Sequence, residues 1–370
     1  MALFIDYFAE IFRGIKLYVR TVVILSIALL FASCAERQNG GKQVTAKIGR
    51  LAVSLINGDK YVFGQNIDLQ CDAESGAVID SLSVSFGGRT MKFARTAKLS
   101  LPTNQASVGQ HTIRITAWTA DGSQAEGRAH VRIVSDVEPE RYTYKIIKQL
   151  PHNHDYYTQG LEFDGDYLYE GTGLEGRSIL YKIDFQKQTV ENSVALDNQY
   201  FGEGVTVLGE KVYQLTWRSF AGFVYNKNTL NKIAGFSYPT EGWGLANDGS
   251  NLIMSDGSEK IYFIDTASFS EVRRIEVYDN NGPVTMLNEL EYVDGLIYAN
   301  IYCSDFIVAI EPTSGKVLKI IDMRGLLNTS ELKQRVDVLN GIAYQKSTNR
   351  WYVTGKLWPK MFQVEFVEKR

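Results

Sequence analysis

The feature that most constrains the fold is an internal repeat in residues 141–370. Five segments align at intervals of 44, 40, 46 and 51 residues, and each opens with a short motif that leads into an apolar, aromatic-rich strand. The openings are Gln159-Gly160-Leu161, Glu203-Gly204-Val205, Trp243-Gly244-Leu245, Glu289-Leu290-Glu291 and Asn340-Gly341-Ile342. Four predicted strands at a period of 40–50 residues are typical of the blades of a β-propeller.

The fifth unit lacks a fourth strand, because the chain ends after the third. The segment Tyr142–Lys148, just before the first unit, can supply it. Such closure pairs the two ends of the ring and leaves no open edge between the first and last blades. We therefore predict an all-β protein with a five-bladed propeller over residues 141–370. The alternative is a second, irregular β domain.

Composition agrees with this fold and narrows the function. The chain contains 21 Tyr, 18 Phe, 5 Trp and 32 Gly against 7 Pro, which favours strands. The formal net charge is −3 and no stretch concentrates Lys and Arg, so we expect no nucleic-acid partner. The four His and three Cys are not grouped as zinc ligands are, so we expect neither a metal nor a cofactor.

The N-terminus resembles an export signal. An uncharged apolar run, Val22–Ala32, follows three basic residues and ends in Phe31-Ala32-Ser33-Cys34, which resembles a bacterial lipobox. We predict a lipoprotein signal peptide over residues 1–33, acylation of Cys34 and a polar tether over residues 34–45. The protein is then exported and membrane-anchored, facing the periplasm or the cell exterior. An uncleaved anchor helix is the alternative.

Residues 46–136 contain six short alternating segments separated by turn signals such as Asn57-Gly58-Asp59. In Thr112–Trp118, for example, Ile113 and Ile115 face one way. About ninety residues with this pattern predict a small immunoglobulin-like β-sandwich. We expect Cys71 and Cys303 to be isolated core thiols rather than a disulfide.

The innermost strand of each blade lines the central channel of a propeller. The five aligned residues Gln159, Glu203, Trp243, Glu289 and Asn340 should therefore surround one mouth of that channel. Loops after the second strands add Trp217, Tyr302, Lys356 and Trp358 near the same end. We predict an aromatic-walled site that binds a small polar group bearing an ammonium. We interpret His152 and His154 as loop residues rather than a metal pair.

Motifs in every unit also match a known family. They are Tyr157-Thr158-Gln159-Gly160-Leu161, Phe201-Gly202-Glu203-Gly204, Leu215-Thr216-Trp217, Glu241-Gly242-Trp243-Gly244, Leu287-Asn288-Glu289-Leu290-Glu291, Leu339-Asn340-Gly341-Ile342 and Thr354-Gly355-Lys356-Leu357-Trp358-Pro359. In order and over about residues 142–366, they resemble the plant and bacterial type of glutaminyl-peptide cyclotransferase, a zinc-independent five-bladed propeller. Residues 1–140 lie outside the resemblance. Tyr302 stands where family members commonly carry Trp, which puts the preference for substrate side chains in doubt.

The resemblance implies an acyltransferase of the aminoacyltransferase class that converts the N-terminal Gln of peptides or proteins to pyroglutamate and releases ammonia. It implies Glu203 as the general acid/base, and Lys356 as the second catalytic residue that stabilises charge. We expect substrate binding by Gln159, Trp217, Trp243, Asn288, Glu289, Tyr302, Asn340 and Trp358. An amide, a Lys or an indole N–H group can donate to the developing oxyanion, and Lys356, Asn288 and Gln159 are the candidates.

Other interpretations remain open. Lys356 could be a solvated loop charge, Trp217 and Trp243 plain core aromatics, and Asn340 a turn cap. The whole protein could be a non-catalytic propeller lipoprotein that binds peptides or glycans. It could also be a metal-dependent propeller lactonase or hydrolase, for which Gln159, Glu203, Glu289 and Asn340 would supply ligands.

Overall fold

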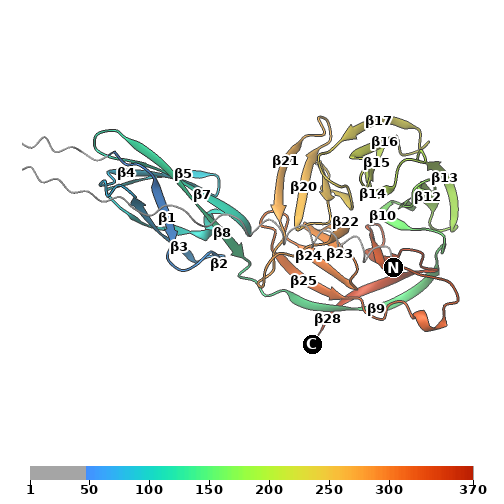
Figure 1. Cartoon of the computed structure of the whole chain (residues 1–370). Helices are drawn as coiled ribbons and strands as arrows, with labels where there is room; N and C mark the ends of the chain where they lie inside the picture. Colours follow the sequence, from blue (N-terminus) through green and yellow to red (C-terminus); the bar gives the residue numbers. More distant parts are fainter. Residues whose placement is uncertain (1–46, 370) are drawn as a thin grey trace, which may run out of the picture. The chain divides into compact units, whose positions relative to one another are not determined.

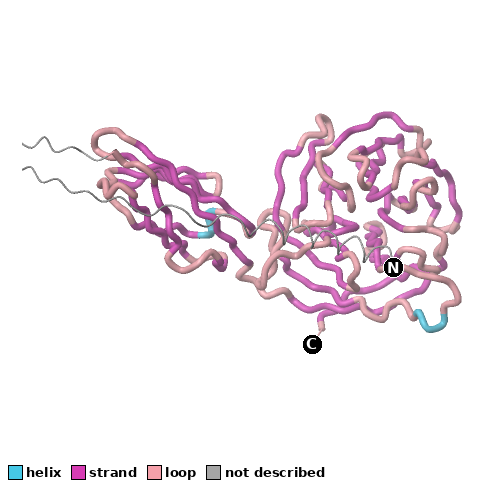
Figure 2. The backbone as a smooth tube through the Cα atoms, in the orientation of Figure 1, coloured by secondary structure: helices cyan, strands magenta, loops and turns pink. Residues whose placement is uncertain are grey.

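The computed structural model describes residues 47–369, and its regular elements are strands apart from two 3₁₀ turns, η1 (Thr103–Gln105) and η2 (Thr329–Glu331) (Figure 2). The all-β prediction is thereby confirmed. Within this range no helix has the length and apolar character that crossing a membrane requires. The predicted signal peptide, Cys34 and tether lie outside the described residues.

The first eight strands form two sheets that enclose one hydrophobic core. In spatial order the smaller sheet contains β1 (Leu51–Leu55), β3 (Asn66–Ala73) and β6 (Lys98–Pro102). The larger contains β2 (Lys60–Val62), β8 (Gln124–Val134), β7 (Gly109–Trp118), β4 (Ser81–Phe86) and β5 (Arg89–Ala94). The sequence missed β2 and β5, because β2 has three residues and β5 buries none of its six.

The predicted alternation in this region is confirmed. In β7, Ile113 and Ile115 are buried while Arg114 between them is exposed, as expected for a strand with one face on the core. Cys71 is a buried free thiol in the same core, as predicted. The prediction for Cys303 was wrong: this free thiol is exposed, because it occupies a turn after β23 with φ of 59°.

The repeat region begins with three separate antiparallel sheets of four sequential strands. The first contains β10 (Thr158–Asp164), β11 (Tyr167–Thr172), β12 (Ile179–Asp184) and β13 (Thr189–Ala195). The second contains β14 (Gly202–Leu208), β15 (Lys211–Thr216), β16 (Ala221–Asn226) and β17 (Lys232–Ser237). The third contains β18 (Leu245–Asn247), β19 (Asn251–Ser255), β20 (Lys260–Asp265) and β21 (Glu271–Glu276).

The remaining strands form one eight-stranded sheet. Its spatial order is β22 (Leu287–Val293), β23 (Leu296–Ile301), β24 (Phe306–Ile310), β25 (Val317–Asp322), β9 (Glu140–Pro151), β28 (Lys360–Glu368), β27 (Arg350–Gly355) and β26 (Leu339–Gln345). β9 pairs antiparallel with β28 over nearly its whole length (Figure 1). The prediction that Tyr142–Lys148 completes the last unit is confirmed.

β9 has a second partner that the sequence did not indicate. Its first residues pair in parallel with β25, so one strand joins the fourth and fifth units. At the opposite edges the first strands β10, β14, β18, β22 and β26 contact one another in succession, and β26 contacts β10. The sheets therefore form a closed, propeller-like ring (Figure 1).

Burial explains why these residues make such a ring. The first strands are almost entirely buried, whereas the outer strands β13, β17 and β21 are mostly exposed. Glycines let the first strands approach one another. A Cβ at Gly204 would lie 2.4 Å from the main-chain nitrogen of Leu245, and one at Gly244 only 1.9 Å from the carbonyl oxygen of Asn288. These positions account for the Gly of the repeated opening motif.

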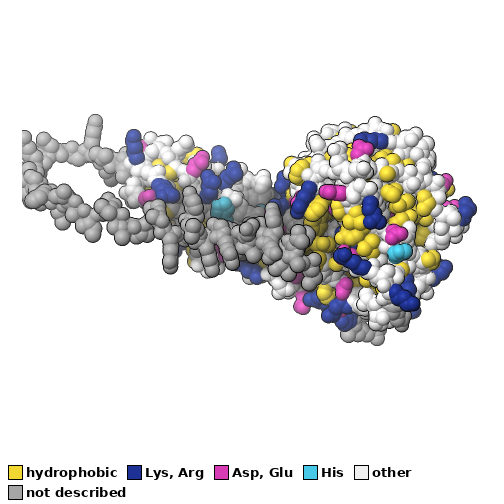
Figure 3. All heavy atoms as spheres, turned by 45° about the vertical axis from the view of Figure 1, so that its right-hand side comes forward, with side chains coloured by type: hydrophobic (Ala, Val, Ile, Leu, Met, Phe, Trp, Pro, Cys, Tyr) yellow, Lys and Arg dark blue, Asp and Glu magenta, His cyan; other side chains and the backbone are white. Residues whose placement is uncertain are grey.

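Charged side chains do not gather into a single-sign patch on the face shown in Figure 3, where basic and acidic groups alternate with neutral surface.

Candidate active site

Five of the predicted site residues lie at β-bulges in the first strands of the sheets. The pairing of β10, β14, β22 and β26 with their neighbours shifts register between Thr158 and Gly160, Gly202 and Val205, Leu287 and Leu290, and Leu339 and Ile342. Gln159, Glu203, Asn288 with Glu289, and Asn340 occupy these four bulges. A β-bulge bends the strand and redirects its side chains, which is why bulges are common beside active sites.

Buried polar groups form the floor of the site. Nε2 of Gln159 donates to Oε1 of Glu203 at 3.2 Å. Nδ2 of Asn340 donates to the carbonyl oxygen of Thr158 at 2.9 Å and to Oε1 of Gln159 at 3.4 Å. Each of these side chains is at most 5% exposed. Three of the five residues predicted to surround the channel mouth are thus linked directly.

Lys356 is also buried, at 3% exposure, which overturns its interpretation as a solvated loop charge. Its main chain is held by Val338, whose carbonyl oxygen accepts from Lys356 N at 2.9 Å. Its Nζ lies 5.0 Å from the ring centre of Tyr157 and 5.1 Å from that of Tyr302. A cation between two rings is stabilised by their electron-rich faces.

Burial shifts the pKa values of Glu203 and Lys356 in opposite directions. It raises the pKa of Glu203 well above its usual value; the charge of Lys356 opposes that rise and the charge of Glu241 adds to it. Burial lowers the pKa of Lys356, against the attraction of Glu203 and Asp337. Desolvation favours the neutral form of each group, so both can exchange protons closer to neutral pH than they would in water.

Half-buried aromatic side chains form the rim. Tyr157 contacts Phe201 edge to face with ring centres 6.2 Å apart, and Phe201 contacts Trp217 at 5.6 Å. On the other side, Trp243 contacts Tyr302 at 5.4 Å. Lys356 contacts the rings of both Tyr157 and Tyr302 and so connects the two sides of the rim. The predicted residues Trp217, Trp243 and Tyr302 therefore lie together, as expected.

The indole N–H groups are already bonded. Trp217 and Trp243 both donate to Oε2 of Glu241, at 2.7 and 3.0 Å. Trp358 donates to the carbonyl oxygen of Asp337 at 2.8 Å and lies in the hydrophobic core, with its ring against Gly355. With these bonds in place, none of the three indole N–H groups is available to an oxyanion. The contacts of Trp358 give it a packing role rather than a place at the rim.

Glu289 has a structural assignment as well. Its Oε1 accepts from Leu161 N at 3.2 Å and its Oε2 from Ile342 N at 2.7 Å, so one carboxylate joins three first strands. These bonds do not support the prediction that Glu289 contacts substrate. Asn288 differs, because its buried Oδ1 has no hydrogen-bond partner among the described residues. A buried unpaired acceptor is uncommon and suits a group that bonds a ligand.

The sequence analysis missed several residues of the site, namely Tyr157, Phe201, Glu241 and Asp337. The first three stand inside the motifs quoted above, within two residues of a predicted site residue, which is the signal that could have found them. Asp337 accepts from the hydroxyl of Tyr157 at 3.3 Å and had no sequence signal.

His152 is a loop residue, as predicted, but its side chain is buried. It is 5% exposed, with Nε2 3.0 Å from Oε1 of Glu170 and Nδ1 2.7 Å from the carbonyl oxygen of Trp358. Since both ring nitrogens face acceptors, these contacts favour the doubly protonated imidazole. His154 is an exposed loop residue, as predicted.

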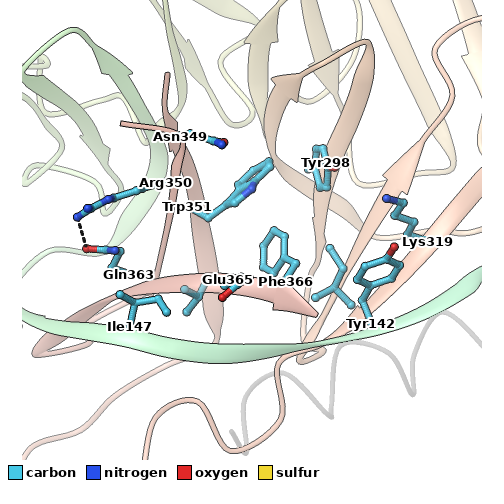
Figure 4. A pocket seen from close by; sticks show the side chains of 12 residues that line it. Tyr142, Ile147, Tyr298, Lys319, Asn349, Arg350, Trp351, Gln363, Glu365 and Phe366 are labelled. Carbon is cyan, nitrogen blue, oxygen red and sulfur yellow. Dashed lines mark hydrogen bonds between the residues drawn. The ribbon is translucent and has the colours of Figure 1, made fainter. Parts of the chain in front are cut away.

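Among residues 47–369 no group of three or more His, Cys, Asp or Glu side chains is placed to hold a metal ion. A cavity of about 410 Å³ lies elsewhere, on the eight-stranded sheet. It is lined by Tyr142, Tyr298, Trp351 and Phe366 together with Lys319 and Arg350 (Figure 4). It contains none of the predicted site residues.

The fold and the site together define a propeller-like, all-β enzyme, and its candidate active site has a polar floor and an aromatic rim. The chain belongs to the glutamine cyclotransferase family, whose family model matches residues 115–366. It is 40% identical over 227 residues to a glutaminyl-peptide cyclotransferase of Arabidopsis thaliana, covering 60% of this chain and 70% of that protein. The crystal structure of Myxococcus xanthus glutaminyl cyclase matches with a TM-score of 0.59 and 33% identity, over 63% of this chain and 100% of that one.

The family match thus confirms the resemblance seen in the motifs. It begins at residue 115, before the expected start near residue 142, and so includes part of β7 and all of β8 and β9.

Proposed function

We propose that this protein converts the N-terminal glutamine of peptides or proteins to pyroglutamate and releases ammonia, as a glutaminyl-peptide cyclotransferase of the aminoacyltransferase class. The observation that carries the proposal is Glu203: a buried carboxyl group with a raised pKa, held by Gln159 and surrounded by an aromatic rim. Family membership supports the same reaction.

In this reaction the α-amino nitrogen attacks the side-chain carbonyl carbon of the same glutamine. A new C–N bond closes the five-membered ring, and the original bond between carbon and amide nitrogen breaks. Glu203 in its carboxylate form accepts the proton that the attacking amine loses, and then delivers that proton to the departing nitrogen, which leaves as ammonia. One carboxyl group thus acts as base and then as acid, and it ends in its starting state.

Lys356 and the side-chain nitrogen Nδ2 of Asn288 are the candidate donors to the oxygen on which negative charge develops. A fixed donor in a site that excludes water acts strongly on such a charge, because no solvent must reorganise as the charge forms. Gln159 and Asn340 hold the floor and can bond the substrate's polar groups. Trp217, Trp243 and Tyr302 would cover the aliphatic part of the glutamine side chain.

We further propose that the closed ring of sheets is a five-bladed β-propeller and that residues 46–136 form an immunoglobulin-like sandwich. We propose that the protein is an exported lipoprotein anchored through Cys34. In cells, the wild-type protein should partition into detergent, and Cys34→Ser should release it. A water-soluble wild-type protein in the periplasm would contradict the anchor.

The activity is tested directly. Purified protein should release ammonia from a peptide with N-terminal Gln, and mass spectrometry should show loss of one ammonia from the peptide. The matched control is the same peptide with its α-amine acetylated, which cannot attack. A protein that binds the free peptide without cyclising it would favour the alternative of a peptide-binding module.

A further inference from the structure

Glu241 connects the two arms of the aromatic rim. Its Oε2 accepts from the indole nitrogens of both Trp217 and Trp243, while its Oε1 accepts from Nε of Arg218 at 2.9 Å. Trp217 comes directly after β15, whereas Trp243 precedes β18 in the next sheet. A single carboxylate therefore fixes two indoles that come from different units.

These bonds close a continuous circuit of contacts around the floor. The circuit runs through Trp217, Glu241, Trp243, Tyr302, Lys356, Tyr157 and Phe201, and returns to Trp217. Every other link in it is a contact between rings or between a ring and a cation. The two links made by Glu241 are hydrogen bonds to a charged acceptor, which are shorter and about twice as strong as neutral ones.

We propose that Glu241 is a positioning residue that holds Trp217 and Trp243 at the spacing required to receive the side chain of an N-terminal glutamine. This inference rests on the proposed function. It assigns the width of the site, and so its selectivity for glutamine, to a carboxylate that itself need not touch the substrate.

The state of Glu241 suits this role. Burial alone would raise its pKa, but hydrogen bonds from Trp243, Arg218 and Trp217 outweigh burial and lower the pKa, so the group is ionised at neutral pH. The Arg218 side chain is 64% exposed, so solvent weakens its ion pair with Glu241. Its guanidinium also lies 3.9 Å from the ring centre of Trp217, so Arg218 supports the same indole.

Removal of this carboxylate should leave the fold intact. The main chain of Trp217 is fixed independently, since its N donates to the carbonyl oxygen of Phe201 at 3.0 Å and its carbonyl oxygen accepts from Gly242 N at 3.1 Å. Trp243 N donates to the carbonyl oxygen of Ser255, and Ser255 N donates to the carbonyl oxygen of the neighbouring Gly244. Glu241 therefore controls side-chain orientation rather than the path of the chain.

Its negative charge has a second effect, on Glu203. The charged or titratable groups that act on Glu203 are Lys356, Glu241 and the hydroxyls of Tyr157, Tyr238 and Tyr302. Lys356 lowers the pKa of Glu203 and Glu241 raises it. Replacing the carboxylate by a neutral amide should therefore shift the acid limb of the rate profile to lower pH.

The test compares Glu241→Ala, Glu241→Gln and the control Glu271→Ala, which removes a carboxylate on the outer strand β21 that pairs with Arg274. Glu241→Ala frees both indoles and should raise KM for a Gln peptide about tenfold, with a smaller effect on kcat, as expected for losing one charge-assisted contact. Glu241→Gln keeps an acceptor for both indoles, so its KM should stay within about threefold of wild type while the acid limb moves down. Glu271→Ala should match wild type in both respects.

Indole N–H signals in a ¹⁵N-edited NMR spectrum give a readout that is independent of catalysis. Two of the five should shift in Glu241→Ala and return close to their original positions in Glu241→Gln. Unmoved indole signals or a wild-type KM in Glu241→Ala would overturn the proposal, as would a Glu241→Gln variant with the same KM as Glu241→Ala. If wild-type protein releases no ammonia, the proposed function fails, and the indole signals still decide the role of Glu241.

Discussion

Glu203 accepts a hydrogen bond from Gln159 across 3.2 Å, between the first strands of two different sheets of the ring. Both residues occupy bulges, so the irregular backbone turns their side chains toward each other. The contact fixes one carboxylate oxygen by an uncharged donor, and burial sets the proton affinity of the group.

Glu203→Gln should lower kcat by about 10²–10⁴-fold, because the amide fills the same space but cannot relay a proton. KM should change far less. Ammonia release and peptide mass measure the loss, with the exposed Glu126→Gln, in the N-terminal sheets, as the control for removal of a carboxylate. Full activity in Glu203→Gln would assign the acid/base role to another group.

Lys356→Met should lower kcat by roughly 10²-fold or less if Lys356 stabilises developing charge, as observed for single oxyanion donors. The same change should raise the melting temperature at neutral pH. The pKa of Lys356 is lowered in the folded protein, so the unfolded chain binds this proton more tightly and the buried lysine destabilises the fold below its unfolded pKa. Calorimetry of the two proteins checks this; a less stable Lys356→Met would contradict it.

Prolonged treatment with a metal chelator should leave cyclisation unchanged. A propeller lactonase or hydrolase would lose its activity under the same treatment, since its metal binds and polarises the substrate. The informative comparison is the rate of ammonia release before and after treatment, with re-addition of Zn²⁺ or Ca²⁺ as the control. Loss of activity that a metal restores would favour the metal-dependent alternative.

His152→Gln should destabilise the protein most at acidic pH. Burial alone would lower the pKa of His152, but the charge and hydrogen bond of Glu170 and the bond to the Trp358 carbonyl raise it overall. A raised pKa stabilises the fold fully below the unfolded value of 6.5, and this stabilisation is lost as pH rises through the folded pKa.

The loss at pH 5.5 should be on the order of 3 kcal/mol, because the substitution leaves Glu170 without its charged partner. Thermal unfolding over a pH series measures it, and the exposed His154→Gln is the control. A difference between wild type and His152→Gln that grows with rising pH would contradict the assigned sign.

A chain that begins at residue 139 should fold, and one that begins at residue 152 should be insoluble. The shorter chain lacks β9, which pairs with both β28 and β25, so two strand edges become unpaired and prone to aggregation. Solubility and thermal unfolding of the two chains decide the point. Equal stability of the two chains would contradict the role assigned to β9 in closing the ring.

The repeat, the all-β class and the closing strand could be predicted from the sequence alone, because the alternation of apolar and polar residues and the spacing of turns are local properties of the chain. Glu203 was indicated by the motif that opens the second unit, and Lys356 by its place in the loop after the second strand of the fifth unit. β2 was missed because it has only three residues, and β5 because its apolar alternation is limited to the partly buried Met91 and Phe93.

The partner of each polar group, by contrast, emerged only from the three-dimensional structure. Glu289 could be interpreted as a substrate ligand until its oxygens were seen to bond Leu161 in the first four-stranded sheet and Ile342 at the opposite edge of its own eight-stranded sheet. The burial of His152 against Glu170 and the bond between Trp217 and Glu241 have the same origin, whereas the exposure of Cys303 follows from its turn after β23. Such bonds join side chains from separate elements that the fold brings together, and a pattern of single residues contains no record of these pairings.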